Sequence, residues 1–197
     1  MPGYAMRSAL EGVMAEEKEQ AGYPEDLEKL MATMKKRRED VPGLIALLKS
    51  KNLLYRRKAA DYLGEIGDDR AVPALVEALK DESDVSWLAA RSLGMIGDRR
   101  AIDPLIEALG SPEKWLRQGA AWALGKIGDE KAIEPLIPIL QDQKKDVRKN
   151  AAWALGIVGD ERAIEPLTRL QQDEDEGVRQ AAKVALDAVK KKIAMRQ

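Results

Sequence analysis

The sequence predicts an all-α protein, an α-solenoid in which about five short helix pairs stack into an alpha-alpha superhelix. Four segments of nearly identical pattern begin with Leu-Gly at residues 63, 93, 124 and 155, so their starts are spaced by 30, 31 and 31 residues. A proline also recurs every 31 residues, at Pro42, Pro73, Pro104, Pro135 and Pro166. Such a period is typical of repeat architectures, because one helix pair this short cannot bury its apolar face without stacked neighbours.

Each repeat is interpreted as two helices. The first follows a Gly-Asp turn, in which the Asp side chain can accept a backbone N–H hydrogen bond, and the recurring proline falls in its first turn. The second is expected to end at a left-handed glycine such as Gly159, whereas Gly156 leaves room for a neighbouring helix. The predicted units are 41–67, 71–97, 102–128, 133–159 and 164–192, followed by a tail at 193–197.

Residues 1–40 lie outside the repeat pattern. The segments 4–20 and 24–39 both have helical patterns, and Pro24 marks a helix start. We expect an N-terminal helical cap that covers the exposed end of the stack. The alternative is an arm that docks in the groove of the array or on another subunit.

One motif carries a family resemblance. The pattern VRxxAAxALGxIGDxxAIxPL, clearest at 147–167, resembles the HEAT-like repeats, especially the short bacterial and archaeal type that is also found in phycobilin lyases. The resemblance extends from residue 41 to residue 192 and implies a concave surface formed by the second helices. It also implies that the arginine after the valine pairs with a turn aspartate between units. The positions that match are Arg56, Arg117, Arg148 and Arg179, whereas the second unit has Ser86 instead.

The second helices present one stripe that the core does not need. At about 100° per residue, Val147, Ala151 and Leu155 share one side of the helix, and Trp153 falls on the opposite side. The equivalent positions vary strongly within this one chain while the core positions stay Ala, Leu or Ile. We call them the second-helix surface: Arg57-Asp61-Glu65, Trp87-Arg91-Met95, Gln118-Trp122-Lys126, Lys149-Trp153-Ile157 and Gln180-Val184-Ala188.

The middle of this surface predicts partner binding. Trp, Met and Arg are enriched in binding hot spots, and an exposed Trp lowers solubility unless it is covered part of the time. The candidate binding residues are Arg57, Asp61, Trp87, Arg91, Met95, Gln118, Trp122, Lys126, Lys149, Trp153 and Ile157. Alternatively, the tryptophans lie flat across neighbouring helices, or residues 1–40 or a second subunit cover them. Trp115 is interpreted separately, as a staple at a helix junction.

The composition excludes several function classes. The chain has no Cys and no His, so neither disulfides, thiolate ligands nor the commonest general base is available. We therefore predict no catalytic residue, no metal site and no cofactor. The net charge of −1 predicts neither nucleic-acid nor membrane binding. No apolar run approaches ~18 residues and no signal-peptide pattern is present, so a cytoplasmic location is expected.

The predicted function is a non-catalytic scaffold that binds another protein or a peptide segment. The resemblance adds a bilin-binding lyase or isomerase subunit as an alternative. A nucleic-acid-binding protein similar to HEAT-like DNA glycosylases is a further alternative, but it requires a basic face, which Asp61 and Glu65 interrupt. A homodimer through the groove or through residues 1–40 is also compatible with the sequence.

Overall fold

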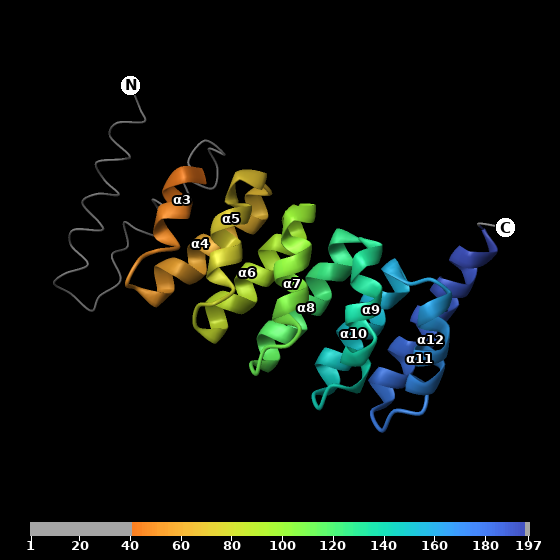
Figure 1. Cartoon of the computed structure of the whole chain (residues 1–197). Coiled ribbons are helices and arrows are strands. Elements are labelled where there is room, and N and C mark those ends of the chain that lie inside the picture. Colours follow the sequence, from red (N-terminus) through yellow and green to blue (C-terminus); the bar gives the residue numbers. More distant parts are fainter. Residues whose placement is uncertain (1–40, 196–197) are drawn as a thin grey trace.

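The computed structural model describes residues 41–195 and confirms an all-α solenoid, in which helix pairs follow one another from α3 to α12 (Figure 1). The first helices of the pairs are α3 (Val41–Leu47), α5 (Val72–Ala78), α7 (Ile102–Ala108), α9 (Ile133–Leu136) and α11 (Glu161–Leu170). The second helices are α4 (Leu53–Ile66), α6 (Ser83–Ile96), α8 (Lys114–Ile127), α10 (Lys145–Val158) and α12 (Glu176–Ala194). The predicted cap at 1–40 lies outside the described residues.

Aspartates start the first helices as predicted, but three of them cap a 3-10 turn that precedes the α-helix. These turns are η1 (Asp69–Ala71), η2 (Arg99–Ala101) and η3 (Glu130–Ala132). In each, the Asp of the Gly-Asp turn accepts a hydrogen bond from the N–H two residues later, as Asp68 does from Arg70. Pro138 opens a further 3-10 segment, η4 (Pro138–Gln141), because a proline cannot donate the next α-helical hydrogen bond.

The glycines that end the second helices do not all share one conformation. Gly67, Gly97 and Gly128 have φ angles of 71°, 76° and 77°, which is the left-handed region that favours glycine. The prediction was wrong for Gly159, whose φ is −62°. At this helix end Lys192 of α12 donates from Nζ to the carbonyl oxygens of Ile157 and Gly159. A side chain from the next unit thus satisfies carbonyl groups that α10 leaves unpaired.

Neighbouring second helices pack closely because a glycine faces the next helix. A Cβ atom placed on Gly94 would lie 2.7 Å from Ala123 Cα, and one on Gly125 would lie 2.8 Å from Ala154 Cα. For Gly156 and Ala185 Cα the distance is 3.0 Å, so the predicted role of this glycine is confirmed. Second helices contact one another along the whole array, whereas first helices contact their neighbours mainly through the short turns. The second helices therefore form the more closely spaced side of the stack.

The outer face of α12 is polar at the positions that receive a neighbour in the preceding units. Lys183 aligns with Ala152, and Asp187 aligns with Gly156. Both Lys183 and Asp187 are exposed, whereas Ala152 and Gly156 are buried. Charged residues thus replace the small residues of the preceding unit at these two positions of α12.

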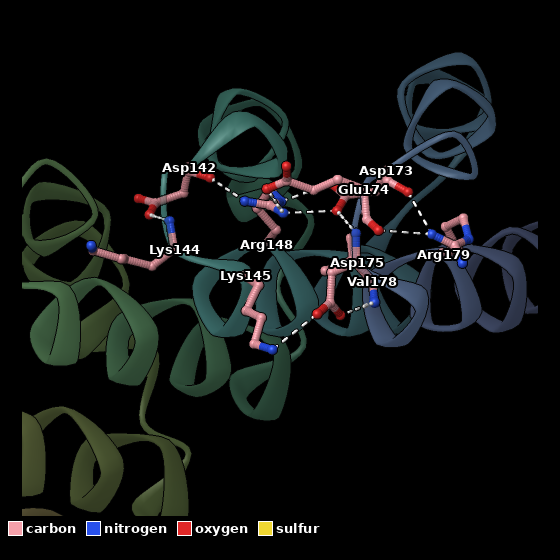
Figure 2. Close-up of polar contacts among 9 residues, drawn as sticks. All are labelled: Asp142, Lys144, Lys145, Arg148, Asp173, Glu174, Asp175, Val178 and Arg179. Atoms are coloured by element: carbon pink, nitrogen blue, oxygen red, sulfur yellow. Dashed lines mark hydrogen bonds and ion pairs between the residues drawn. The ribbon is translucent and has the colours of Figure 1, made fainter.

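Arginine–aspartate pairs connect consecutive units. The N–O distances are 2.7, 2.6 and 2.7 Å for the pairs Arg56–Asp81, Arg117–Asp142 and Arg148–Asp173. Each arginine also donates to a loop carbonyl of its own unit, as Arg148 does to Asp142 O at 2.9 Å (Figure 2). Arg179 differs from the expectation, because it contacts the carbonyl oxygens of Asp173 and Glu174 instead of a carboxylate. These arginines fix the angle between one helix pair and the next.

Between the second and third units, both members of such a pair are replaced. Ser86 and Ser111 stand 25 residues apart, which is the separation of the three charged pairs. Ser111 Oγ still accepts a hydrogen bond from Glu113 N at 3.1 Å, as Asp142 Oδ1 does from Lys144 N at 2.8 Å. Because the arginine and the aspartate are both replaced by serine, no carboxylate is left at this position without an arginine partner.

The capping aspartates predict a loss of stability in acid. Hydrogen bonds from the Arg70 guanidinium and backbone N–H lower the pKa of Asp68 to about 2, and the pKa of Asp98 is lowered in the same way by Arg100. A carboxyl with a lowered pKa stabilises the fold above its unfolded pKa of about 3.9, and this contribution is lost as the pH falls through the folded pKa. We expect the urea midpoint to fall between about pH 4 and pH 2. Circular dichroism measures the urea midpoint at each pH. The Arg70→Ala variant should show a shallower decrease, and a midpoint that stays constant with pH would contradict the prediction.

Candidate functional site

The second-helix surface carries most of the large apolar side chains that the described residues expose. Met95, Trp153 and Ile157 are 37%, 37% and 47% exposed, and all three lie at predicted positions. Val184, the equivalent of Trp153 on α12, is 59% exposed. Trp87 and Trp122 are half-buried. The apolar part of the surface thus follows α6, α8, α10 and α12, with its most exposed members on the last two helices.

Two tryptophans form a stacked pair across adjacent helices. The ring centroids of Trp122 and Trp153 are 6.4 Å apart, with 13° between their planes. Each ring lies over the glycine of the preceding helix: Trp153 Cζ3 is 2.6 Å from a Cβ built on Gly125, and Trp122 Cζ3 is 3.0 Å from one built on Gly94. Trp122 also packs against the core. Both rings therefore lie against the preceding second helix, and Trp153 remains partly exposed to solvent.

The charged residues of the surface fall into a paired group and an unpaired group. Arg91 contacts Asp61 at 2.8 Å, and Arg57 contacts Asp84 at 3.4 Å, so the charges of α4 and α6 are largely compensated. Lys126 Nζ lies 5.8 Å from the Trp122 ring centroid. Within the described residues, neither Lys126 nor Lys149 makes an ion pair. The positive charge that a ligand can meet is thus concentrated on α8 and α10.

The remaining candidate, Gln118, lies between the two groups. Gln118 is half-buried, and its backbone carbonyl oxygen accepts a hydrogen bond from Asn150 Nδ2 at 3.2 Å. The eleven candidates therefore lie along the second helices α4, α6, α8 and α10.

Trp115, interpreted from the sequence as a staple at a helix junction, lies in the first turn of α8. It is 45% exposed, and Lys114 Nζ lies 4.5 Å from its ring centroid. A cavity of about 520 Å³ lies beside it, between the first turns of α8 and α10. Its lining includes Lys114, Trp115, Gln118, Lys144 and Lys145. The sequence could have indicated that this cavity adjoins the second-helix surface. Lys114 precedes Gln118 by four residues, the same spacing that separates Gln118 from Trp122, so the three residues share one face of α8.

The part of the chain that the structure describes offers little for metal-dependent chemistry or membrane insertion. Among residues 41–195, no group of three or more acidic side chains could hold a metal ion. No helix in this range is long and apolar enough to cross a membrane. What the geometry supplies is a continuous surface of aromatic, aliphatic and basic side chains on a rigid stack of helices.

The fold and this surface define the class of α-solenoid repeat proteins. The family model for HEAT repeats matches at 27–86, 41–118, 81–142 and 102–187, and the chain belongs to this family. No curated protein matches the sequence.

Solved structures support the same architecture. A chain of the complex of CpcE and CpcF of phycocyanin lyase from Nostoc sp. PCC7120 is 29% identical, with a TM-score of 0.70, and the match covers 77% of this chain. The match spans only 65% of that lyase chain. A designed armadillo repeat protein in complex with peptide (KR)4 is 21% identical with a TM-score of 0.61, covering 82% of this chain and 86% of the designed one, which is a likeness of fold alone.

Proposed function

We propose that the protein is a non-catalytic scaffold that binds a segment of a partner protein on its second-helix surface. The observation that carries the proposal is the exposure of Met95, Trp153 and Ile157 on the second-helix surface. The core does not require apolar residues at these positions, because the equivalent residues in the first unit are Asp61 and Glu65. A repeat that needed apolar residues here for folding would carry them in every unit.

The geometry of this surface suits an anchor-type interface. Trp153 and Ile157 are four residues apart on α10 and therefore lie next to each other on one face of the helix. Trp153 is supported from below by Gly125 and from the side by Trp122, so its ring is already ordered before a partner binds. Ordered aromatic anchors lose little conformational entropy on association, which favours affinity. Lys126 and Lys149 border this anchor and would set the orientation of the partner.

A bilin-binding lyase subunit is the second candidate, and one comparison favours it. The likeness to the phycocyanin lyase complex is the strongest of the solved structures described above in both identity and TM-score. A planar linear tetrapyrrole could lie along the Trp122–Trp153 stack, with its propionates near Lys126 and Lys149. Incubation with a bilin would then shift the absorbance spectrum of the pigment, and Trp153→Ala would remove the shift.

The scaffold proposal predicts that truncation of the anchor abolishes partner binding. The partner is captured from an extract of the native host, identified and purified, and its Kd is then measured by calorimetry. We expect Trp153→Ala combined with Ile157→Ala to raise the Kd by about thirtyfold, since a hot-spot truncation costs about 2 kcal/mol. Met195→Ala is the matched control, because Met195 is 78% exposed and lies at the end of α12, away from the anchor.

The outcomes separate the candidates. An unchanged Kd in the double variant, with circular dichroism showing the same helix content, would contradict the scaffold proposal. An absorbance shift that depends on Trp153, without any protein partner, would replace it by the bilin-binding function. Sedimentation of the chain alone tests a second copy as the partner, since a dimer that the double variant dissociates would identify it.

A further inference from the structure

The basic residues of the surface form two adjacent rows. The rows follow a four-residue spacing, so each lies along one face of its helix. On α8 the row is Lys114, Gln118, Trp122 and Lys126, and on α10 it is Lys145, Lys149, Trp153 and Ile157. We call these eight residues the α8–α10 strip. It contains four lysines and no carboxylate, although the whole chain has a net charge of −1.

The positive charge is local to this strip. The corresponding row on α4 contains Asp61 and Glu65, and the row on α12 begins with Glu176. On α6 the only basic member, Arg91, is paired with Asp61. An anionic ligand is therefore attracted by the lysines of α8 and α10, and it is repelled by the carboxylates on α4 and α12.

Most of the lysines in the strip keep their charge available. Lys145 is the exception, since Nζ lies 3.0 Å from Asp175 Oδ2 (Figure 2). Lys114 and Lys126 lie over the rings of Trp115 and Trp122, at 4.5 and 5.8 Å from the centroids. A cation held over a ring still has N–H donors directed away from it, so both can accept a carboxylate partner.

The cavity beside Trp115 adds a place for an apolar side chain. Its volume of about 520 Å³ lies within the range of ligand pockets, which is about 300–1,000 Å³. The Arg148 guanidinium at its wall is occupied by Asp173, and Figure 2 shows the Lys144 side chain extending away from that pair. The cavity lining thus combines an exposed indole with Lys114 and Lys144 on one side and with the carboxylates of Asp146, Glu174 and Asp175, so an apolar side chain suits it better than a charged one.

We propose that the α8–α10 strip binds an acidic segment of a partner protein, which places carboxylates on Lys114, Lys126 and Lys149 and an apolar side chain in the Trp115 cavity. This proposal rests on the proposed function and names the chemistry of the partner. Charge complementarity carries it, because the strip contains no carboxylate and, among residues 41–195, Lys114, Lys126 and Lys149 make no ion pair. A nucleic acid is the less favoured ligand, since its phosphates repeat beyond two helices and would reach the carboxylates on α4 and α12.

The test compares synthetic ligands of one length and different charge. Fluorescein-labelled peptides contain four copies of Glu-Glu-Leu, Gln-Gln-Leu or Lys-Lys-Leu, and a labelled oligothymidine represents nucleic acid. Binding to the full chain is measured by fluorescence anisotropy at low salt. We expect the glutamate peptide to bind about tenfold tighter than the glutamine peptide, which corresponds to one or two carboxylate–lysine contacts. The lysine peptide should bind more weakly than both.

A pair of charge-reversal variants locates the site. Lys126→Glu with Lys149→Glu should weaken binding of the glutamate peptide at least tenfold, whereas Lys183→Glu with Lys190→Glu makes the same change in net charge on exposed positions of α12 and should leave binding within about twofold. Trp115→Ala should also weaken binding, because it removes one wall of the cavity. Equal effects of the two reversals, equal affinity for the glutamate and glutamine peptides, or tighter binding of oligothymidine would each overturn the proposal.

The natural partner distinguishes a failure of this inference from a failure of the proposed function. If Trp153→Ala with Ile157→Ala releases the partner and the reversal of Lys126 and Lys149 does not, the surface binds a protein and the acidic partner is wrong. If neither variant releases it, both proposals fail. Release by both variants supports both.

Discussion

Truncation of Arg148 to alanine is expected to detach the last helix pair from the rest of the stack. Its side chain and that of Asp173 are only 8% and 9% exposed, and their atoms meet at 2.7 Å. Burial by itself raises the pKa of Asp173, but the hydrogen bonds from Arg148 and from the Asp175 backbone N–H, together with the charge of Arg148, outweigh it and leave the pKa lowered. Arg148→Ala therefore leaves a buried carboxylate without its partner, which costs about 3–5 kcal/mol.

The effect should be localised, because a solenoid is stabilised by contacts between nearest neighbours. We expect amides of α12 to exchange with solvent at least about a hundredfold and up to several thousandfold faster, since each 1.36 kcal/mol is about a factor of ten, while amides of α4 and α6 keep their rates. Hydrogen exchange with mass spectrometry measures both. The matched control is Arg169→Ala in the same unit, whose partner Glu165 is 75% exposed and whose loss should cost less than about 0.5 kcal/mol.

The chain itself contains a natural example in which both members of the arginine–aspartate pair are replaced. Ser86 of the second unit and Ser111 of the third occupy the two equivalent positions. Arg148→Ser combined with Asp173→Ser copies that pair and removes both charges at once. The double variant should therefore be more stable than Arg148→Ser alone, because no uncompensated charge remains buried. Equal stability of the single and double variants would show that the Arg148–Asp173 pair does not couple the units.

The repeat pattern made most of the fold predictable. The period repeats core residues, capping aspartates and inner glycines in most units, so the helix pairs could be assigned before any contact was known. The exceptions are local departures from the period. Gly159 loses its left-handed conformation because Lys192, from the unusually long helix α12, binds the carbonyl groups there. Pro138, a proline outside the period, breaks the fourth first helix into α9 and η4.

The surface was predictable as a set of positions but not as a set of contacts. The helical wheel placed Trp122 and Trp153 away from the core, yet it treats each helix in isolation. It therefore left open whether the rings lie across neighbouring helices, and it could not place each ring over a glycine of the preceding helix or show that Trp122 is half-buried. The exposure of Trp115 could not be predicted for the same reason, since it depends on the arrangement of α8 against α10. Contacts between repeats depend on the distance between helices, which the period alone does not give.

The second large effect is expected from Gly125→Ala, which adds a single carbon atom. That atom would lie 2.6 Å from Trp153 Cζ3 and 2.8 Å from Ala154 Cα. The indole can rotate away, but the backbone of α10 can move only if the two helices separate. We expect a loss of about 1–3 kcal/mol from overpacking, which exceeds the gain of up to about 1 kcal/mol from the helix propensity of alanine. Urea unfolding measures the difference.

The control substitution is Gly110→Ala, where the nearest atom to the added carbon is Glu107 O at 3.5 Å, an ordinary contact. Its free energy of unfolding should stay within about 0.5 kcal/mol of the wild type. A Gly125→Ala variant as stable as this control would show that α8 and α10 are farther apart than the structure places them.

The same variant tests whether the close contact of the helices also orders the surface. Trp153 lies flat because Gly125 has no side chain, and this position lets it stack on Trp122. In Gly125→Ala the indole must move, so the near-ultraviolet circular dichroism of the stacked pair should decrease. Combining it with Trp153→Ala removes the indole clash and leaves only the contact with Ala154. The loss of stability in the combined variant should thus be smaller than the sum of the two single losses. Additive losses would mean that the glycine sets the helix spacing alone and that the tryptophan is positioned by other contacts.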